Sequence, residues 1–232
     1  MNMITAVSPW RLFCLAAAVA AGFPCAHAAN PAWPESKRLV VEIVVSPGAT
    51  LLDFAGPAEV FGVAPTNVAE YLVAATRTPV RLENGVVVVP DYTFATAPTP
   101  DIVIIGSQAG PASAQAVAWL RKTHEADHLV MSVCTGADWL AQAGLLGGLV
   151  AATHHHAVTS FQKRYSSVRF VGGKRFVQGD AHLYTAGGYT AGLDLALHIM
   201  DQRLGRAAAT KIAARLEYKG DAWITNEGWA AD

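Results

Sequence analysis

The chain has 232 residues and a formal charge of −1, from 17 Lys+Arg against 18 Asp+Glu. Its composition, 52% hydrophobic and only 15% charged, is that of a globular or membrane protein and excludes a disordered chain. No nucleic-acid partner is expected, because a surface that binds nucleic acid needs an excess of Lys and Arg on one face. The cysteines, three in all, are too few for a disulfide framework in a chain of this length.

The segment 1–28 is predicted to be an export signal and not part of the fold. Arg11 precedes an apolar run at 12–23, which is shorter than the roughly 20 residues that a bilayer span needs. Ala26-His27-Ala28 then has the small-x-small pattern of a signal-peptidase site. A membrane anchor or a buried core helix is the alternative interpretation. With cleavage after Ala28, we expect a periplasmic or secreted protein without stable membrane association.

Cleavage would change the cysteine count as well as the charge. Residues 1–28 hold Arg11 and no acidic residue, so their removal changes the formal charge from −1 to −2. Cys14 and Cys25 leave with them, and Cys134 is then the sole cysteine. In an oxidising compartment it has no intramolecular partner. Such a thiol is buried and inert, engaged with another chain, or retained for its chemistry.

The remaining sequence predicts an exposed leader at 29–38 and a single α/β domain at 39–232. In chain order we first expect a strand at 39–45, a short helix at 58–63 with Pro57 at its start, and strands at 71–75, 86–89 and 102–105. A helix at 112–122, a strand at 129–133, a helix at 137–146, a strand at 149–152 and a helix at 157–164 should follow. The last expected elements are a strand at 168–171, a hairpin of 176–177 with 182–184, and helices at 192–204 and 206–218.

These elements predict how the domain is layered and where it binds ligands. Apolar strands that alternate with helices form a mostly parallel central sheet with helices on both faces. In such a sheet, ligands bind outside the carboxyl ends of the strands.

Cys134 follows the buried strand at 129–133 directly and precedes a helix, so it sits at that edge of the sheet. A residue held in such a turn presents its side chain above the sheet, as in a nucleophile elbow. The helix N-terminus would lower the pKa of the thiol, and its free N–H groups would accept an oxyanion. The alternative is a buried cysteine that acts as a small hydrophobic side chain.

An acidic residue, Asp53, lies among apolar residues in the loop expected after the first strand. A buried carboxyl there must be paired or protonated. If the two loops meet at one sheet edge, Asp53 would serve as acid or base beside Cys134. Local helix capping by Asp53 is the alternative, and Glu59 is the competing acid.

Several motifs resemble those of the ThiJ/PfpI superfamily, which has a class I glutamine-amidotransferase-like, flavodoxin-type fold. They are Cys134-Thr135-Gly136, Ala143-Gly144-Leu145-Leu146 and Ala152-Thr153-His154. The segments 52–57, 132–136, 186–194 and 216–218 are similar, in order and spacing, to isocyanide hydratases and to the amidase-like domains of AraC-type regulators. The resemblance covers almost all of 39–218.

The resemblance implies a homodimer with Cys134 as nucleophile and Asp53 facing it. It implies an enzyme that adds water to a small-molecule isocyanide to give an N-formamide, with no metal or organic cofactor. The backbone N–H of Thr135 would belong to the anion pocket, which we also expect to be lined by Gly106, Ser107, Gln108, His154 and Gly187.

The sequence departs from the hydratase pattern at two places near this pocket. Gly106-Ser107-Gln108 replaces a Pro-Gly-Gly turn, so the side chains of Ser107 and Gln108 would narrow or repolarise the pocket. His155 replaces a tryptophan after His154. If 154 to 156 were a strand, His154 and His156 would point to one side, but no acid or cysteine stands beside them at metal spacing, so no metal site is expected.

Two other functions stay open. A cofactor-free glyoxalase or deglycase acting on reactive aldehydes uses the same superfamily thiol, although it would place Glu and His near the cysteine. A non-catalytic ligand-binding or redox-sensing domain is favoured by the changed turn and disfavoured by the presence of both Cys134 and Asp53.

Overall fold

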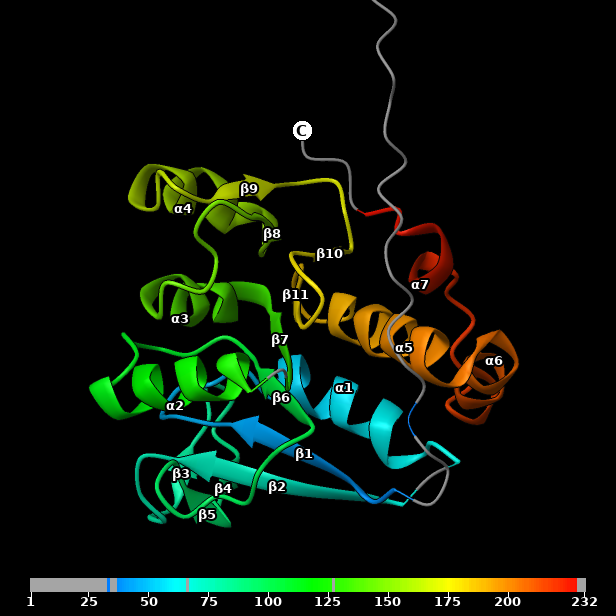
Figure 1. Ribbon diagram of the computed structural model, residues 1–232, viewed down its shortest axis with the longest axis horizontal. Coiled ribbons are helices and arrows are strands. Elements are labelled where there is room, and N and C mark those ends of the chain that lie inside the picture. Colours follow the sequence, from blue (N-terminus) through cyan, green and yellow to red (C-terminus); the bar gives the residue numbers. More distant parts are fainter. Residues whose placement is uncertain (1–32, 34–36, 66, 127, 229–232) are drawn as a thin grey trace, which may run out of the picture.

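The computed structural model describes residue 33 and residues 37–65, 67–126 and 128–228 (Figure 1). The expected signal at 1–28 and most of the expected leader at 29–38 lie outside these residues.

The described part of the chain forms a seven-stranded central sheet with the order β10-β11-β7-β6-β1-β2-β5. All neighbours are parallel except β10 and β11, which form the antiparallel hairpin expected from the sequence. The strands are β1 (Leu39–Val44), β2 (Val68–Ala74), β5 (Tyr92–Thr93), β6 (Ile102–Ile105), β7 (Leu129–Val133), β10 (Phe176–Gln178) and β11 (Leu183–Ala186). Strands β3 (Val80–Arg81) and β4 (Val87–Val88) form a separate antiparallel pair, and β8 (Val150–Ala152) and β9 (Arg169–Val171) a separate parallel pair.

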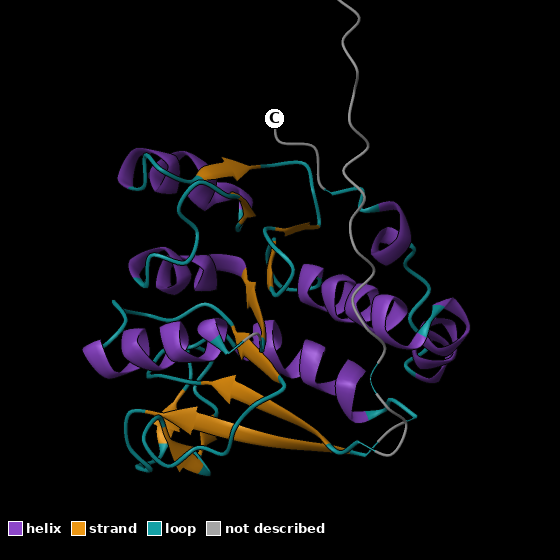
Figure 2. Ribbon diagram, viewed as in Figure 1, coloured by secondary structure: helices purple, strands orange, loops and turns teal. Residues whose placement is uncertain are grey.

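Helices cover both faces of the central sheet, as Figures 1 and 2 show. One layer holds α1 (Leu51–Gly62), α5 (Ala191–Leu204), α6 (Arg206–Arg215) and α7 (Ala222–Thr225), and the other holds α2 (Ala114–Glu125), α3 (Ala137–Gln142) and α4 (Val158–Arg164). Side chains alternate along each strand, so Val41 and Ile43 of β1 pack in the α1 and α5 layer while Val44 packs in the α2 and α3 layer. The predicted doubly covered, mostly parallel α/β sheet is confirmed. None of the described helices is long and apolar enough to cross a membrane.

The two strands next to the expected site have the predicted bounds. Strands β6 and β7 begin and end as expected from their apolar runs, and every residue in them is buried. Such runs can only be satisfied inside a sheet that is covered on both faces. The loops that follow β6 and β7 are therefore placed side by side at the carboxyl edge.

Helix α1 differs from the prediction. It begins at Leu51, so Asp53 lies in its first turn and Pro57 lies inside the helix instead of at its start. A proline favours the first position of a helix because it has no N–H to donate, which is the basis of the predicted start at Pro57. The loss of one helical hydrogen bond is tolerated here, since Pro57 is buried against α5. The earlier start fixes Asp53 on a rigid element.

Candidate functional site

Cys134 sits between β7 and α3, at the start of a one-turn 3-10 helix, Cys134–Gly136. Its φ is +61°, in the left-handed region that side chains rarely adopt. The N–H of Cys134 donates to the carbonyl of Gly187 at 2.7 Å, and its carbonyl accepts the hydroxyl of Thr153 at 2.9 Å. The predicted turn is therefore present, and contacts from β11 and β8 hold it on both sides. Cys134 is 6% exposed.

Asp53 is fully buried and its carboxyl is fixed by two backbone donors. Oδ2 accepts the N–H of Ser107 at 2.9 Å, and Oδ1 accepts the N–H of Tyr189 at 3.0 Å. Gly106 makes room for this arrangement, because a Cβ at that position would lie 2.8 Å from the Cβ of Asp53. The predicted alternative, Glu59, is exposed on α1 beside Glu70 and does not face the cysteine.

The thiol of Cys134 and the carboxyl of Asp53 are hydrogen-bonded to each other. Burial raises the pKa of Asp53, and the N–H groups of Ser107 and Tyr189 offset this only in part. Burial and the charge of Asp53 raise the pKa of the Cys134 thiol to about 12, against the opposing N–H of Thr135. The lowered thiol pKa expected from the helix N-terminus is wrong for the resting protein, in which sulfur keeps its proton.

Comparison with known proteins identifies the family to which this chain belongs. Residues 40–202 match the DJ-1/PfpI family, a range that includes both members of the pair. The chain belongs to the DJ-1/PfpI family. An isonitrile hydratase of Pseudomonas putida is 31% identical over 184 residues, which cover 78% of each chain. An HTH-type transcriptional regulator of Pseudomonas aeruginosa is 27% identical over 139 residues, 59% of this chain and 37% of the regulator.

Solved structures agree with this DJ-1/PfpI assignment. A ThiJ/PfpI family protein from Pseudomonas syringae superposes with a TM-score of 0.69 at 26% identity, covering 81% of this chain and 78% of that one. Drosophila melanogaster DJ-1beta superposes with a TM-score of 0.67 at 20% identity, over 79% of this chain and all of that one. At that identity the second match shows the fold alone. The resemblance to the ThiJ/PfpI superfamily is thus confirmed.

Three of the expected pocket residues lie next to the pair formed by Cys134 and Asp53. They are Gly106, Ser107 and Thr135. The hydroxyls of Ser107 and Thr135 are 2.7 Å apart and hydrogen-bonded, which ties the loop after β6 to the turn after β7. The replacement of a glycine by Ser107 leaves its backbone N–H in use, because that N–H holds Asp53. The turn at 106–108 thus has a backbone N–H that donates to Asp53, and a side-chain hydrogen bond joins it to Thr135.

Gln108 turns away from the pair. Its Nε2 donates to the carbonyls of Val44 and Gly106, and its Oε1 accepts the hydroxyl of Ser46 at 2.6 Å. These contacts occupy the amide within the loops after β1 and β6. The side chain of Gln108 thus supports these loops and does not face the pair.

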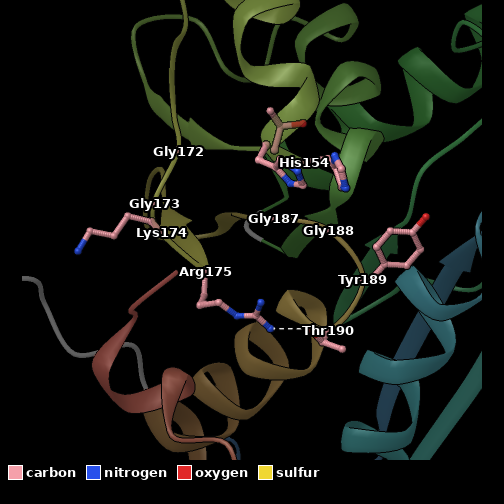
Figure 3. Close-up of a pocket in the computed structure, with 11 residues that line it drawn as sticks. His154, Gly172, Gly173, Lys174, Arg175, Gly187, Gly188, Tyr189 and Thr190 are labelled. Atoms are coloured by element: carbon pink, nitrogen blue, oxygen red, sulfur yellow. Dashed lines mark hydrogen bonds between the residues drawn. The ribbon is translucent and has the colours of Figure 1, made fainter. Parts of the chain in front are cut away.

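His154 and Gly187 line a pocket of about 210 Å³ beside the pair, shown in Figure 3. β8 ends at Ala152, and His155 and His156 lie in a 3-10 helix, so the three histidines do not alternate as a strand would place them. Their rings gather instead, with centroids 3.9 to 5.2 Å apart. Within the described residues no cluster of three or more His, Cys, Asp or Glu side chains is placed to hold a metal.

Tyr189 and Thr153 belong to the site but were not expected there. Tyr189 adopts a left-handed φ of +52° and donates its N–H to Asp53, and the residue is 45% exposed. A backbone donor has no residue-type signal. The one signal that could have placed Tyr189 in the site is its position after Gly187-Gly188, at an expected strand-to-helix turn.

Proposed function

We propose that this DJ-1/PfpI protein is a cysteine-dependent lyase that hydrates an isocyanide to an N-formamide. The observation that carries the proposal is the elbow thiol of Cys134, hydrogen-bonded to a buried Asp53 that two N–H groups fix in place. The sequence similarity to an isonitrile hydratase supports it.

The reaction needs the proton that Cys134 and Asp53 share and one molecule of water. The sulfur of Cys134 bonds to the terminal isocyanide carbon while the thiol proton passes through the carboxyl of Asp53 to the same carbon, giving a thioimidate, R–N=CH–S. Water then adds across the C=N bond, the C–S bond breaks, and R–NH–CHO leaves as sulfur regains its proton. One water is added and no electrons are transferred, so the chemistry requires no redox cofactor.

The raised thiol pKa and the low exposure fit this sequence of steps. A thiol with a pKa of about 12 is protonated at neutral pH, so attack must be coupled to proton removal by Asp53. With Cys134 only 6% exposed, the approach to sulfur is narrow. A linear isocyanide, whose reactive carbon is at its tip, suits such an approach better than a planar aldehyde.

The test is a direct assay of formamide production from an aryl isocyanide. Wild type should turn over the substrate, and Cys134→Ser and Asp53→Asn should not. Methylglyoxal, assayed in parallel, examines the glyoxalase or deglycase alternative. Turnover by Cys134→Ser equal to that of wild type would exclude the nucleophilic role.

A second candidate is a ligand-binding or redox-sensing domain without turnover. The buried, protonated thiol favours it, since a cysteine of this kind reacts slowly unless a base acts on it. The regulator similarity points the same way. Ligand-induced protection of Cys134 from alkylation, with no turnover of either substrate, would support this candidate.

We further propose export and a homodimer. The supporting features are the signal-like segment at 1–28 and the family resemblance. Sequencing of the protein from a periplasmic extract should give an N-terminus at Ala29. Sedimentation should give twice the mass of the cleaved chain. An intact Met1 or a monomer would contradict the respective proposal.

A further inference from the structure

Among the described residues, the side chains that line the pocket beside the pair include hydrogen-bond donors and cations, and none is a carboxylate. It lies between the loop after β8, the loop joining β9 to β10 and the turn joining β11 to α5 (Figure 3). Its lining includes Thr153, His154, Lys174, Arg175, Gly187 and Tyr189. Side-chain cations and glycine-rich walls, without acids, are the chemistry of an anion site.

Three lining residues connect this pocket to the catalytic pair. Gly187 accepts the N–H of Cys134, and Thr153 donates to the carbonyl of Cys134. Tyr189 donates its N–H to Asp53. A molecule bound in the pocket therefore lies against the same backbone that positions the sulfur and the carboxyl. The pocket is placed to hold the part of a substrate that does not react.

Arg175 is the cation that the fold holds most firmly there. Its Nε donates to Oδ2 of the fully buried Asp194 at 2.6 Å, and its Nη2 donates to the hydroxyl of Thr190 at 2.9 Å. Tyr218 donates to the other oxygen of Asp194 at 2.7 Å. Among the described residues no hydrogen bond is recorded for Nη1 of Arg175, whose side chain is 21% exposed. The guanidinium is thus anchored on one side and open on the other.

His154 contributes a neutral donor. Its Nδ1 accepts the N–H of His156, so the ring proton lies on Nε2. Burial and the neighbouring histidines lower the pKa of His154, which keeps the ring neutral at pH 7. The ring lies against Gly188, where a Cβ would be 2.3 Å from Cδ2. Glycine at 188 is what lets this donor reach the pocket wall.

Lys174 adds charge at the rim, where its side chain extends outward (Figure 3). The carboxylate of Asp194 offsets the charge of Arg175 from beneath. Among the described lining residues, Lys174 and Arg175 are thus the two cations, and together with the directed donors they suit a small anionic group.

We propose that this pocket binds an anionic arm of the substrate, a carboxylate or a phosphate, anchored by Arg175 and His154 while the reactive group points to Cys134. The inference rests on the proposed function for the identity of the reactive group, but not for the anion site itself. Its volume of about 210 Å³ accommodates a compact group such as a carboxylate or a phosphate.

Binding is tested on Cys134→Ser, so that no turnover is needed. By calorimetry, N-formylglycine should bind at least about tenfold more tightly than its neutral amide, because charge-assisted hydrogen bonds are the stronger ones. Inorganic phosphate is the third probe. Tighter binding of phosphate than of N-formylglycine identifies a phosphate site, and the reverse order a carboxylate site. Equal affinity for the acid and the amide overturns the proposal.

Variants identify the residues. The Arg175→Met and Asp194→Asn double variant removes the buried ion pair without leaving an unpaired charge, and His154→Gln leaves that ion pair intact. Both should abolish the preference for the acid. Arg206→Met is the matched control, since Arg206 pairs with Asp201 on the surface, and the preference should persist. A preference that survives both pocket variants overturns the proposal.

A kinetic assay distinguishes failure of this inference from failure of the proposed function. If isocyanoacetate and its methyl ester are both hydrated, the acid should have the higher kcat/KM in wild type and lose that advantage in His154→Gln. If the acid probe binds selectively while neither isocyanide is hydrated, the anion site stands and the hydratase proposal fails.

Discussion

The thiol of Cys134 donates its hydrogen bond to the carboxyl of Asp53, and the charge of that carboxyl raises the pKa of the thiol. The acid is fixed on α1 and the sulfur at the end of β7, so the contact is made by two rigid elements. At rest the pair keeps the proton on sulfur. In the proposed reaction, turnover therefore depends on how readily Asp53 removes that proton when a substrate arrives.

Asp53→Asn should separate the two roles of this carboxyl. Loss of its negative charge should lower the pKa of Cys134, so alkylation by iodoacetamide at pH 8 should become faster. Hydration of an isocyanide should nevertheless fall by roughly 100-fold or more, because the base is lost. Alkylation rates between pH 6 and 11, together with kcat/KM, check both statements.

Glu83→Gln is the matched control for that variant. Glu83 adds to the negative charge felt by Asp53 and hydrogen-bonds to Thr50, but it does not contact the sulfur. Its substitution should leave kcat/KM within about twofold of wild type. A loss as large as that of Asp53→Asn would mean that general charge, and not the base at Asp53, controls the reaction.

Gly106→Ala should displace Asp53. The added Cβ would lie 2.8 Å from the Cβ of Asp53, so the helix or the loop must shift. We expect at least a tenfold loss in kcat/KM and destabilisation of about 1–3 kcal/mol, as for overpacked sites. Gly110→Ala is the control from the same loop, since its Cβ would meet no atom within 4 Å. Equal activity in the two variants would show that Asp53 tolerates displacement.

The left-handed backbone at Cys134 predicts an unusual order of stability. At a φ of +61° a side chain is strained, and glycine is not. Cys134→Gly should therefore be more stable than Cys134→Ala by about 1 kcal/mol, although glycine normally destabilises a folded element. Urea unfolding of the two variants measures the difference. If Cys134→Ala were the more stable variant, the backbone at residue 134 would not be strained.

Local signals in the sequence were enough to place the sulfur. The apolar runs of β6 and β7 predicted both strands to the residue, and the residues after β7 predicted the elbow. The sequence offered the meeting of Asp53 with Cys134 at a shared edge of the sheet as one interpretation, beside local helix capping, and in the structure the two side chains interact.

Long-range placement explains what the sequence did not predict. The donor role of the Tyr189 N–H depends on a backbone dihedral and not on the side chain. Gln108 was expected in the pocket, but its amide is satisfied by the loop after β1, which neighbours it only in the folded sheet. The thiol pKa likewise depends on burial among distant elements, which outweighs the local helix N-terminus.

Glu42 is a buried acid that the site does not use. It lies on the central strand β1, fully buried, and neither carboxyl oxygen has a hydrogen-bond partner among the described residues. Burial raises its pKa from 4.5 to about 8. The folded protein therefore keeps a proton on Glu42 that the unfolded chain loses at a lower pH.

This difference in proton binding sets the sign of the pH dependence. Between pH 4.5 and about 8 the native state binds one more proton at Glu42, so its contribution to stability falls as the pH rises. The slope is about 1.4 kcal/mol per pH unit for one group. Glu42→Met should remove this pH-dependent contribution. In urea unfolding at pH 5, 6, 7 and 8, the free energy of unfolding of the variant should therefore rise relative to that of wild type as the pH increases. Glu227→Gln, at an exposed position, should follow the wild-type curve. Parallel curves for Glu42→Met and wild type would mean that the carboxyl of Glu42 is hydrated in the folded protein.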